Sequence, residues 1–260
     1  MSKHNKKILI IGDSWSRSWY HGFVSNSFQN LAYIRGRSQQ SHPFPLMKAT
    51  LEQVIETVID ETIPGNDLAR ITHDLKLSEE QNIDYIIFIQ TDPMRNFDTN
   101  KFKYLNLDKF IAMYNRTLKE TYTELHDISK NRFNSIPILM LGGHEKINTS
   151  ILNEINSDVL HCVEPSMLEY LYKISMKTDI TLEEFMHYPL LFPRWSHDID
   201  STWNKEIINF IHDQKLYYDR FIASDAFYQW MRPDVHHLNA SGLIRISDRL
   251  LEYIETNFDK

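Results

Sequence analysis

The stretch KILIIGDSWS, residues 7–16, decides the fold class of this chain. A continuous apolar run over residues 8–11 stops at Gly12, and Asp13 and Ser14 follow directly. Short apolar runs without alternation are typical of parallel strands that are buried on both faces. Open α/β sheets bind their ligands outside the carboxyl ends of such strands. The stretch therefore predicts a buried first strand that ends in a serine-bearing turn.

Three further apolar segments are predicted to be central parallel strands. They cover residues 85–89, 136–141 and 158–163. Tyr33 and Ile34 favour a short additional strand that ends at Gly36. Because the intervals carry apolar residues at helical spacing, the sequence predicts strands that alternate with helices. Such alternation implies right-handed crossovers and a doubly wound, mainly parallel sheet.

Helical spacing is clear in three places along the chain. It predicts a helix over residues 51–58, a longer one over 110–122, and a final one that begins at 239–241. Their apolar stripes are Leu51, Val54, Ile55 and Val58; Phe110, Ile111, Tyr114, Leu118 and Tyr122; and Leu243, Ile246, Leu250 and Ile254. Residues 177–202 form an irregular aromatic segment, which is either a packed surface excursion or a lid or substrate wall. We expect one domain over residues 1–260.

The composition is that of an ordinary globular protein, with 42% hydrophobic and 24% charged residues. A formal net charge of -7 argues against a nucleic-acid-binding surface. The apolar segments are too short to span a membrane, and the run before Gly12 is too short for a secretion signal. These features predict a soluble, cytoplasmic protein. Cys162 is the only cysteine, and its apolar neighbours indicate an inert, buried thiol.

Both ends of the chain carry residues that serine catalysis needs. A serine hydroxyl becomes a nucleophile when a histidine takes its proton and a carboxylate orients that histidine. Asp234 and His237 lie just before the final helix, so one loop can present both to Ser14. His236 is the alternative base, because sequence alone does not say which imidazole turns inward. Taken singly, Ser14 and Asp234 are also ordinary turn or cap residues.

The joint arrangement of Gly12-Asp13-Ser14 and Asp234-x-x-His237 resembles the first and last blocks of the SGNH or GDSL hydrolase superfamily. The resemblance implies a three-layer α/β/α, flavodoxin-like fold with a central, mainly parallel sheet. It also implies that Ser14 is the nucleophile, that His237 is the general base and that Asp234 orients His237. Gly36, in the stretch RGRS, resembles the second block, whose glycine donates a backbone N–H to the oxyanion; a plain turn glycine is the alternative.

The third block departs from the family pattern. Where the family has Gly-x-Asn-Asp after a strand, this chain has Ile89-Gln90-Thr91-Asp92. Thr91 takes the place of the asparagine, and its hydroxyl can donate a hydrogen bond. Gln90 or Asn96 can instead supply an amide. Loss of one oxyanion donor costs roughly 100-fold to 1,000-fold in turnover, so the change is compatible with reduced activity and does not require inactivity.

The sequence therefore predicts an SGNH-type esterase that cleaves a small acyl ester, such as an O-acetyl group on a carbohydrate, through an acyl-enzyme. An acyltransferase with the same triad and a noncatalytic carbohydrate-binding or structural protein are the alternatives. No metal and no obligatory cofactor are predicted, because the sequence holds no recognised ligand cluster or phosphate-binding glycine loop. The expected partner is a small-molecule or glycan ester, with no nucleic acid and no membrane, and the oligomeric state stays open.

Overall fold

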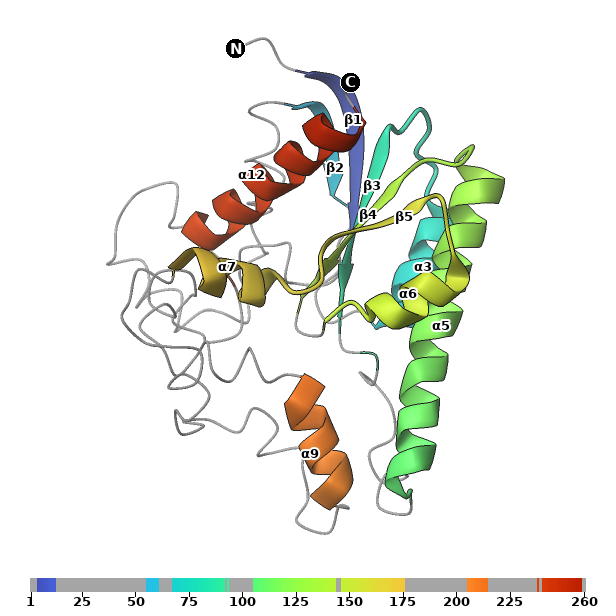
Figure 1. Cartoon of the computed structure of the whole chain (residues 1–260). Coiled ribbons are helices and arrows are strands. Elements are labelled where there is room, and N and C mark those ends of the chain that lie inside the picture. Colours follow the sequence, from blue (N-terminus) through green and yellow to red (C-terminus); the bar gives the residue numbers. More distant parts are fainter. Residues whose placement is uncertain are drawn as a thin grey trace, which may run out of the picture.

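A computed structural model describes residues 4–12, 55–60, 67–91, 93, 105–143, 146–175, 205–214, 238 and 240–258. Within them, five strands form one sheet, in which every neighbouring pair is parallel (Figure 1). The strands are β1 (His4–Ile11), β2 (Ile55–Asp60), β3 (Tyr85–Gln90), β4 (Ile138–Gly142) and β5 (Leu160–Glu164). Their spatial order is β2-β1-β3-β4-β5. This is the strand order of flavodoxin-like, doubly wound folds.

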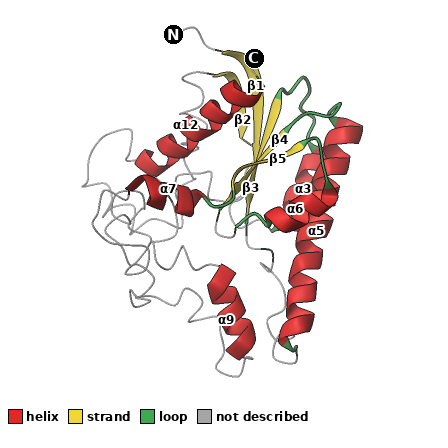
Figure 2. Ribbon diagram, in the orientation of Figure 1, coloured by secondary structure: helices red, strands yellow, loops and turns green. Residues whose placement is uncertain are grey.

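Helices cover both faces of the sheet (Figures 1 and 2). One face carries α7 (Met167–Ser175) and α12 (Ala240–Asn257), and the other carries α3 (Leu68–Leu77), α5 (Leu107–Arg132) and α6 (Thr149–Ile155). A further helix, α9 (Lys205–Gln214), contacts α5. The layers are helix, sheet and helix, so the predicted three-layer α/β/α fold is confirmed.

The central strands contribute side chains to two separate hydrophobic cores, one on each face of the sheet. Ile10 and Ile87 pack on the side of α7 and α12, whereas their chain neighbours Leu9 and Phe88 pack on the side of α3, α5 and α6. All four side chains have no exposed area. Because successive residues of a strand point to opposite faces, burial on both faces requires a continuous apolar run. This is why the central strands can be read directly from the sequence.

Three helices on one face begin at residues whose side chains cap them. Asp67, Asn106 and Asn148 each accept a hydrogen bond from the backbone N–H three residues later, at 2.8, 3.0 and 3.1 Å. Each bond satisfies one of the N–H groups that the first helical turn leaves without a partner. The chain therefore begins α3, α5 and α6 at defined residues.

The main sequence predictions for the fold are confirmed. The four predicted central strands coincide with β1, β3, β4 and β5 within a few residues, and the pattern over residues 110–122 lies within α5. The final helix begins at Ala240, as predicted, and its predicted stripe is buried: Leu243, Ile246, Leu250 and Ile254.

The predicted helix over residues 51–58 is wrong, because residues 55–60 form β2. This strand pairs in parallel with β1 and lies at the edge of the sheet, with Thr57 opposite Lys7 and Ile59 opposite Leu9. The segment contains Ile55, Thr57, Val58 and Ile59, all β-branched, which favours a strand. The helical spacing of its apolar residues is overridden by the backbone ladder to β1.

Some predictions fall on other parts of the chain. The short strand at Tyr33 and Ile34 and the irregular segment 177–202 lie outside the described residues. The single domain over residues 1–260 stays a prediction. Among the described helices, none combines the length and the apolar character that crossing a membrane requires.

Candidate active site at the carboxyl edge of the sheet

Gly12 follows the last residue of β1 directly and packs against β3. Gly12 is buried and has a φ of +149°, a conformation that residues with a side chain rarely adopt. A Cβ atom at this position would lie 2.9 Å from the carbonyl oxygen of Ile89 and 3.0 Å from its Cβ. Glycine is therefore required here for two reasons, its backbone conformation and the close approach of the two strands.

Gln90, the last residue of β3, is fully buried and uses both ends of its side chain. Its Nε2 donates a hydrogen bond to the carbonyl oxygen of Lys146 at 2.7 Å, and its Oε1 accepts one from the Tyr122 hydroxyl at 2.5 Å. Its backbone carbonyl also accepts a hydrogen bond from the N–H of Gly143 at 3.2 Å. Gln90 thus connects β3 to helix α5 and to Gly143 and Lys146, which lie between β4 and α6.

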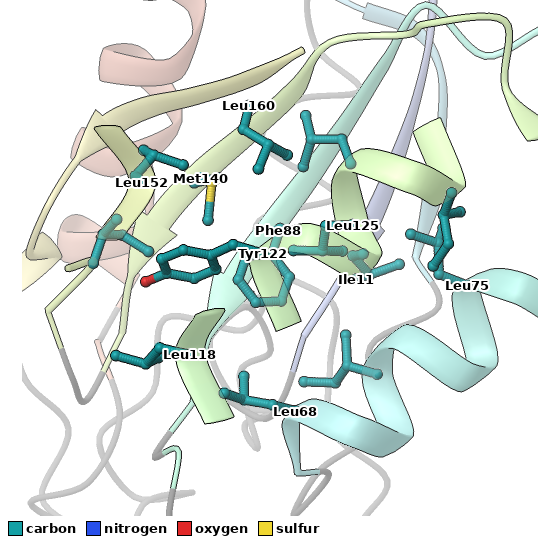
Figure 3. Close-up of a cluster of buried hydrophobic side chains, with 14 of the residues drawn as sticks. Ile11, Leu68, Leu75, Phe88, Leu118, Tyr122, Leu125, Met140, Leu152 and Leu160 are labelled. Atoms are coloured by element: carbon teal, nitrogen blue, oxygen red, sulfur yellow. The ribbon is translucent and has the colours of Figure 1, made fainter. Parts of the chain in front are cut away.

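Tyr122 supplies the second half of this connection. Its ring lies among the apolar side chains of one core, close to Phe88 and Met140, with the hydroxyl at the edge of the cluster (Figure 3). The hydroxyl accepts a hydrogen bond from the N–H of Asn148 at 3.1 Å while it donates to Gln90. Burial raises the pKa of Tyr122 far above its ordinary value, so the phenol stays protonated and remains a donor.

The segment that precedes α6 is held by more than this pair. The N–H of Ile147 donates a hydrogen bond to the carbonyl oxygen of Pro165 at 2.8 Å. Lys146 Nζ lies 3.0 Å from a carboxylate oxygen of Glu169 in α7, and Lys173 lies 2.9 Å from the other oxygen. Burial acts to raise the pKa of Glu169, but the two ammonium groups outweigh it and the pKa lies below its ordinary value. Glu169 is therefore an ionised anchor for this segment.

Thr91 follows Gln90 directly and has no exposed area. It lies at the carboxyl end of β3, one residue beyond the strand and next to the bonded side chain of Gln90. Gln90 and Thr91, the two described candidates from the third block, therefore lie at the predicted edge of the sheet. Both polar atoms of the Gln90 side chain have partners within the protein.

The opposite face of the sheet anchors the start of the last helix. Leu238, two residues before α12, has 1% of its surface exposed and belongs to the core between α12 and the sheet. Farther along the helix, Arg249 Nε donates a hydrogen bond to Glu164 at 2.7 Å, which ties α12 to the carboxyl end of β5. Leu238 and Arg249 therefore hold α12 against the sheet, one just before the helix and one in its middle.

Helix α5 reaches far beyond the sheet at this edge (Figure 1). Tyr122 meets the last residue of β3, and residues 107–121 precede it in the helix, which corresponds to roughly 20 Å of helix beyond that contact. Phe210 of α9 packs against Phe110 and Tyr114 in this extension, with ring centroids 5.9 and 5.4 Å apart. This extension of α5 and helix α9 therefore pack against each other beyond the carboxyl edge of the sheet.

The residues predicted to perform the chemistry are divided between described and undescribed parts of the chain. Ser14, Gly36, Asp234 and His237 lie outside the described residues, as does the alternative base His236. Gln90 and Thr91 are described and lie at the carboxyl end of β3. Tyr122 and Asn148 were not recognised as site residues from the sequence, where Tyr122 was only one member of a helical stripe. The available signal was a polar Gln90 at the end of an otherwise apolar strand.

The remaining sequence predictions for this region concern metals and Cys162. Among the described residues, no three His, Cys, Asp or Glu side chains are grouped as metal ligands would be. Cys162 is half-buried and not fully buried as predicted. Burial and the nearby charge of Glu164 raise the pKa of its thiol to about 12, so the thiol is protonated near neutral pH. A protonated thiol is a poor nucleophile and a poor metal ligand.

The described part of the chain defines a doubly wound α/β protein with a candidate site at the carboxyl edge of β1 and β3. No protein-family model and no curated protein sequence matches the chain. Among solved structures, a protein from Parabacteroides merdae ATCC 43184, provisionally described as a GDSL-like lipase, is 13% identical; the alignment covers 84% of this chain and 100% of that chain, with a TM-score of 0.35.

A second solved structure is LAE5, an alpha/beta hydrolase enzyme from the metagenome of Lake Arreo, Spain. It is 14% identical, the alignment covers 97% of this chain and 95% of that chain, and the TM-score is 0.36. Similarity at this level assigns neither a family nor an activity to this chain.

Proposed function

We propose that this protein is a serine hydrolase of the SGNH type that cleaves a small acyl ester, with an O-acetyl group on a carbohydrate as the substrate class. Ser14 is the nucleophile, His237 the general base and Asp234 the residue that orients His237. The observation that carries the proposal is the end of β1, where a conformationally required glycine precedes Asp13 and Ser14.

The position of β1 in the sheet supports this proposal. In the order β2-β1-β3-β4-β5, the chain leaves β1 toward β2 on one side and returns to β3 on the other. The carboxyl ends of β1 and β3 therefore flank the point where the crossovers diverge, which is where doubly wound folds bind ligands. Gly12 packs against Ile89 at this point, and Ser14 is two residues farther along the chain.

The second support comes from the other end of the chain. His237 is adjacent in sequence to Leu238, which is buried in the core, and Leu238 is followed closely by α12. A base on a segment with such an anchor loses little conformational entropy when it aligns with the nucleophile. The spacing Asp234-x-x-His237 then allows one loop to carry both the base and the group that orients it.

The chemistry follows the acyl-enzyme route. His237 takes the proton of the Ser14 hydroxyl as the oxygen attacks the ester carbonyl, and it returns the proton to the leaving alcohol. Water then attacks the carbonyl of the acyl-enzyme while His237 takes its proton; the bond to the Ser14 oxygen breaks, the acid leaves, and His237 returns the proton to Ser14. The backbone N–H groups of Ser14 and Gly36, with a group from the third block, stabilise the oxyanion of each tetrahedral intermediate.

The direct test is labelling with a fluorophosphonate, in which the Ser14 oxygen attacks phosphorus, the P–F bond breaks and His237 accepts the serine proton. Intact mass is measured for the unmodified protein and for Ser14→Ala and His237→Ala. Stoichiometric labelling that both substitutions abolish is expected. Ser16→Ala is the matched control, because it removes a nearby hydroxyl and should leave labelling intact.

Two outcomes would reject the proposal. If folded, unmodified protein is not labelled, the noncatalytic carbohydrate-binding alternative takes its place. If labelling persists in Ser14→Ala, another residue is the nucleophile and the assignment at the end of β1 is wrong. After a positive result, release of free acetate from acetylated sugars, compared with transfer of the acetyl group to an added sugar, separates a hydrolase from an acyltransferase.

A further inference from the structure

Three consecutive residues between β4 and α6, namely Lys146, Ile147 and Asn148, contact elements on both faces of the sheet. The carbonyl oxygen of Lys146 accepts a hydrogen bond from Gln90 in β3 at 2.7 Å, and the N–H of Asn148 donates one to Tyr122 in α5 at 3.1 Å. Ile147 has 3% of its surface exposed and belongs to the core that α3, α5 and α6 cover. One side of this segment is therefore fixed to the buried network of Gln90 and Tyr122.

The same segment is attached to α7, which lies on the opposite face of the sheet (Figure 1). Lys146 Nζ lies 3.0 Å from a carboxylate oxygen of Glu169, in the first turn of α7. The N–H of Ile147 donates a hydrogen bond at 2.8 Å to the carbonyl oxygen of Pro165, two residues before α7. Residues 146–148, named the strap from here on, therefore connect the two helical layers at the carboxyl edge.

Helix α7 has only nine residues and depends on contacts of this kind. Isolated helices of this length are not stable in water, so tertiary packing must hold them. Met167 and Leu171 have no exposed area and pack in the core with α12. Among the described residues, the charged groups that act on Glu169 are Lys146 in the strap and Lys173 one turn along α7. Lys173 pairs within the helix, whereas Lys146 ties the helix to the other layer.

We propose that the strap couples α7 to the network of Gln90 and Tyr122 across the sheet, and that the ion pair between Lys146 and Glu169 is the link that acid releases. When Glu169 gains a proton, its attraction to the Lys146 ammonium group is lost. Helix α7 then opens more often while the sheet and α5 stay folded, because their buried cores do not depend on this pair. The strap does not involve Ser14, so its coupling is tested separately from the proposed esterase activity.

The direction of the pH dependence follows from the charges around Glu169. Burial acts to raise its pKa, but Lys173 and Lys146 outweigh burial, and the pKa lies below the ordinary value of 4.5. The ion pair is therefore complete near neutral pH and is lost as the pH falls through the lowered pKa. Glu169→Gln has the shape of the protonated side chain, so it produces the released state at neutral pH.

Amide hydrogen exchange of the full chain measures the opening of α7. Protection factors for residues 170–174 remove the intrinsic pH dependence of exchange, and the buried strand β4 reports global unfolding. Glu169→Gln at about pH 7 should speed α7 exchange roughly threefold to tenfold, with α7 still exchanging faster than β4. In the unmodified protein, α7 protection should fall to the level of Glu169→Gln as the pH drops from about 5 to about 3.

A double-mutant cycle tests whether the coupling passes through the ion pair. Tyr122→Phe removes a hydrogen bond to the strap and should speed α7 exchange at least about threefold, although the two lie on opposite faces of the sheet. In the Glu169→Gln protein the link is already lost, so adding Tyr122→Phe should speed α7 exchange less than about twofold. Gln90→Met, which removes the other bond to the strap, serves if Tyr122→Phe folds poorly. Ser129→Ala is the matched control, because it removes a buried hydroxyl of α5 that bonds away from the strap, and it should leave α7 exchange unchanged.

Three results would overturn the coupling. If Glu169→Gln leaves α7 protection unchanged, the ion pair does not hold the helix. If Tyr122→Phe leaves it unchanged, the buried network and α7 are independent. If Tyr122→Phe speeds α7 exchange equally with and without Glu169→Gln, the coupling bypasses the ion pair. Acceleration by each single substitution that is not multiplied in the double variant, with no effect of Ser129→Ala, is the result that the strap requires.

Discussion

Gly12 is the single residue on which the carboxyl edge of β1 depends most. Alanine at this position must adopt a φ near +149° and place its Cβ 2.9 Å from the Ile89 carbonyl oxygen. Strained backbone and overpacking each cost roughly 1–3 kcal/mol. We expect Gly12→Ala to lower the free energy of unfolding by at least about 2 kcal/mol, measured by urea denaturation, and to slow the labelling of Ser14 in the folded protein.

Ile128→Val provides the comparison for this prediction. It removes one methylene from a buried position of α5 and should cost roughly 0.5–1.5 kcal/mol, with no change in the labelling rate of the folded protein. A Gly12→Ala protein that is as stable as the unmodified one would show that the two strands separate easily, against the close approach described above.

The side chains at this edge show how far a single sequence can be read. The turn at Gly12 can be predicted from the sequence, because Gly12 ends an apolar run and precedes polar turn residues. The hydrogen bond from Tyr122 to Gln90 cannot be predicted in this way, because the partners are 32 positions apart and neither residue belongs to a local motif. Pairings of this kind depend on the register between a helix and a strand, which local patterns do not determine. The triad of Ser14, Asp234 and His237 stays a prediction.

Among the elements, α9 depends on a small aromatic contact with the extension of α5. Phe210 is half-buried against Phe110 and Tyr114, while Asn209 beside it is exposed. Phe210→Ala should remove roughly 1–3 kcal/mol of packing and release α9 first. Hydrogen exchange should then accelerate in the α9 amides, with little change in the last three turns of α5. Asn209→Ala is the control, and equal exchange in both variants would show that other contacts hold α9.

An ion pair that is only partly exposed to water links β5 to α12. Arg249 and Glu164 are 2.7 Å apart, with 31% and 18% of their side chains exposed. The Glu164 carboxylate is the main reason that the pKa of Arg249 is raised. Arg249→Met keeps much of the aliphatic stem but leaves Glu164 without this partner, and it should cost about 1 kcal/mol after allowance for solvent screening.

Arg116 offers a matched surface pair for this measurement. It is paired with Glu120 on α5, and both side chains are mostly exposed. Arg116→Met should leave the urea midpoint unchanged, because water screens an exposed pair of this kind. If Arg249→Met also leaves the midpoint unchanged, then packing alone holds α12 against β5.

The elements also show which sequence patterns are reliable. β1, β3 and β4 can be predicted because burial on both faces makes residues 8–11, 85–89 and 138–141 continuous apolar runs. β2 was assigned to a helix because an edge strand keeps some polar residues, such as Thr57, and its apolar spacing then also fits a helix. The β-branched residues of this segment favour a strand more strongly than the spacing favours a helix. For β2, therefore, the spacing of apolar residues alone does not separate a strand from a helix.

At the scale of the whole molecule, charge and burial predict how stability depends on pH. Burial lowers the pKa of His161 below its ordinary value of 6.5, although Asp158 opposes the shift. The folded state therefore prefers neutral His161, and its ring packs edge-on against Phe258 at 5.1 Å. The unfolded chain binds a proton at this histidine more readily than the folded protein does. This contribution to stability is present above about pH 6.5 and is lost as the pH falls through the folded-state pKa.

Two carboxylates, those of Glu124 and Glu169, make stability depend on pH in a second, lower pH range. Burial acts to raise the pKa of Glu124 and of Glu169, but ion pairs with lysines outweigh it and lower both pKa values below the ordinary 4.5. Their contribution is present above about pH 4.5 and is lost as the pH falls through the lowered values. Acid therefore acts in the same direction at all three groups, first at His161 and then at the two glutamates.

One substitution can isolate the contribution of His161 to the pH dependence of stability. Urea denaturation at about pH 7.5 and about pH 5.5 gives the loss of unfolding free energy between the two conditions. The loss should be smaller in His161→Gln than in the unmodified protein, because the variant has no histidine to protonate on unfolding at that position. An equal loss in His161→Gln would mean that His161 protonates as readily in the fold as in the unfolded chain, and that the contact with Phe258 does not depend on its charge.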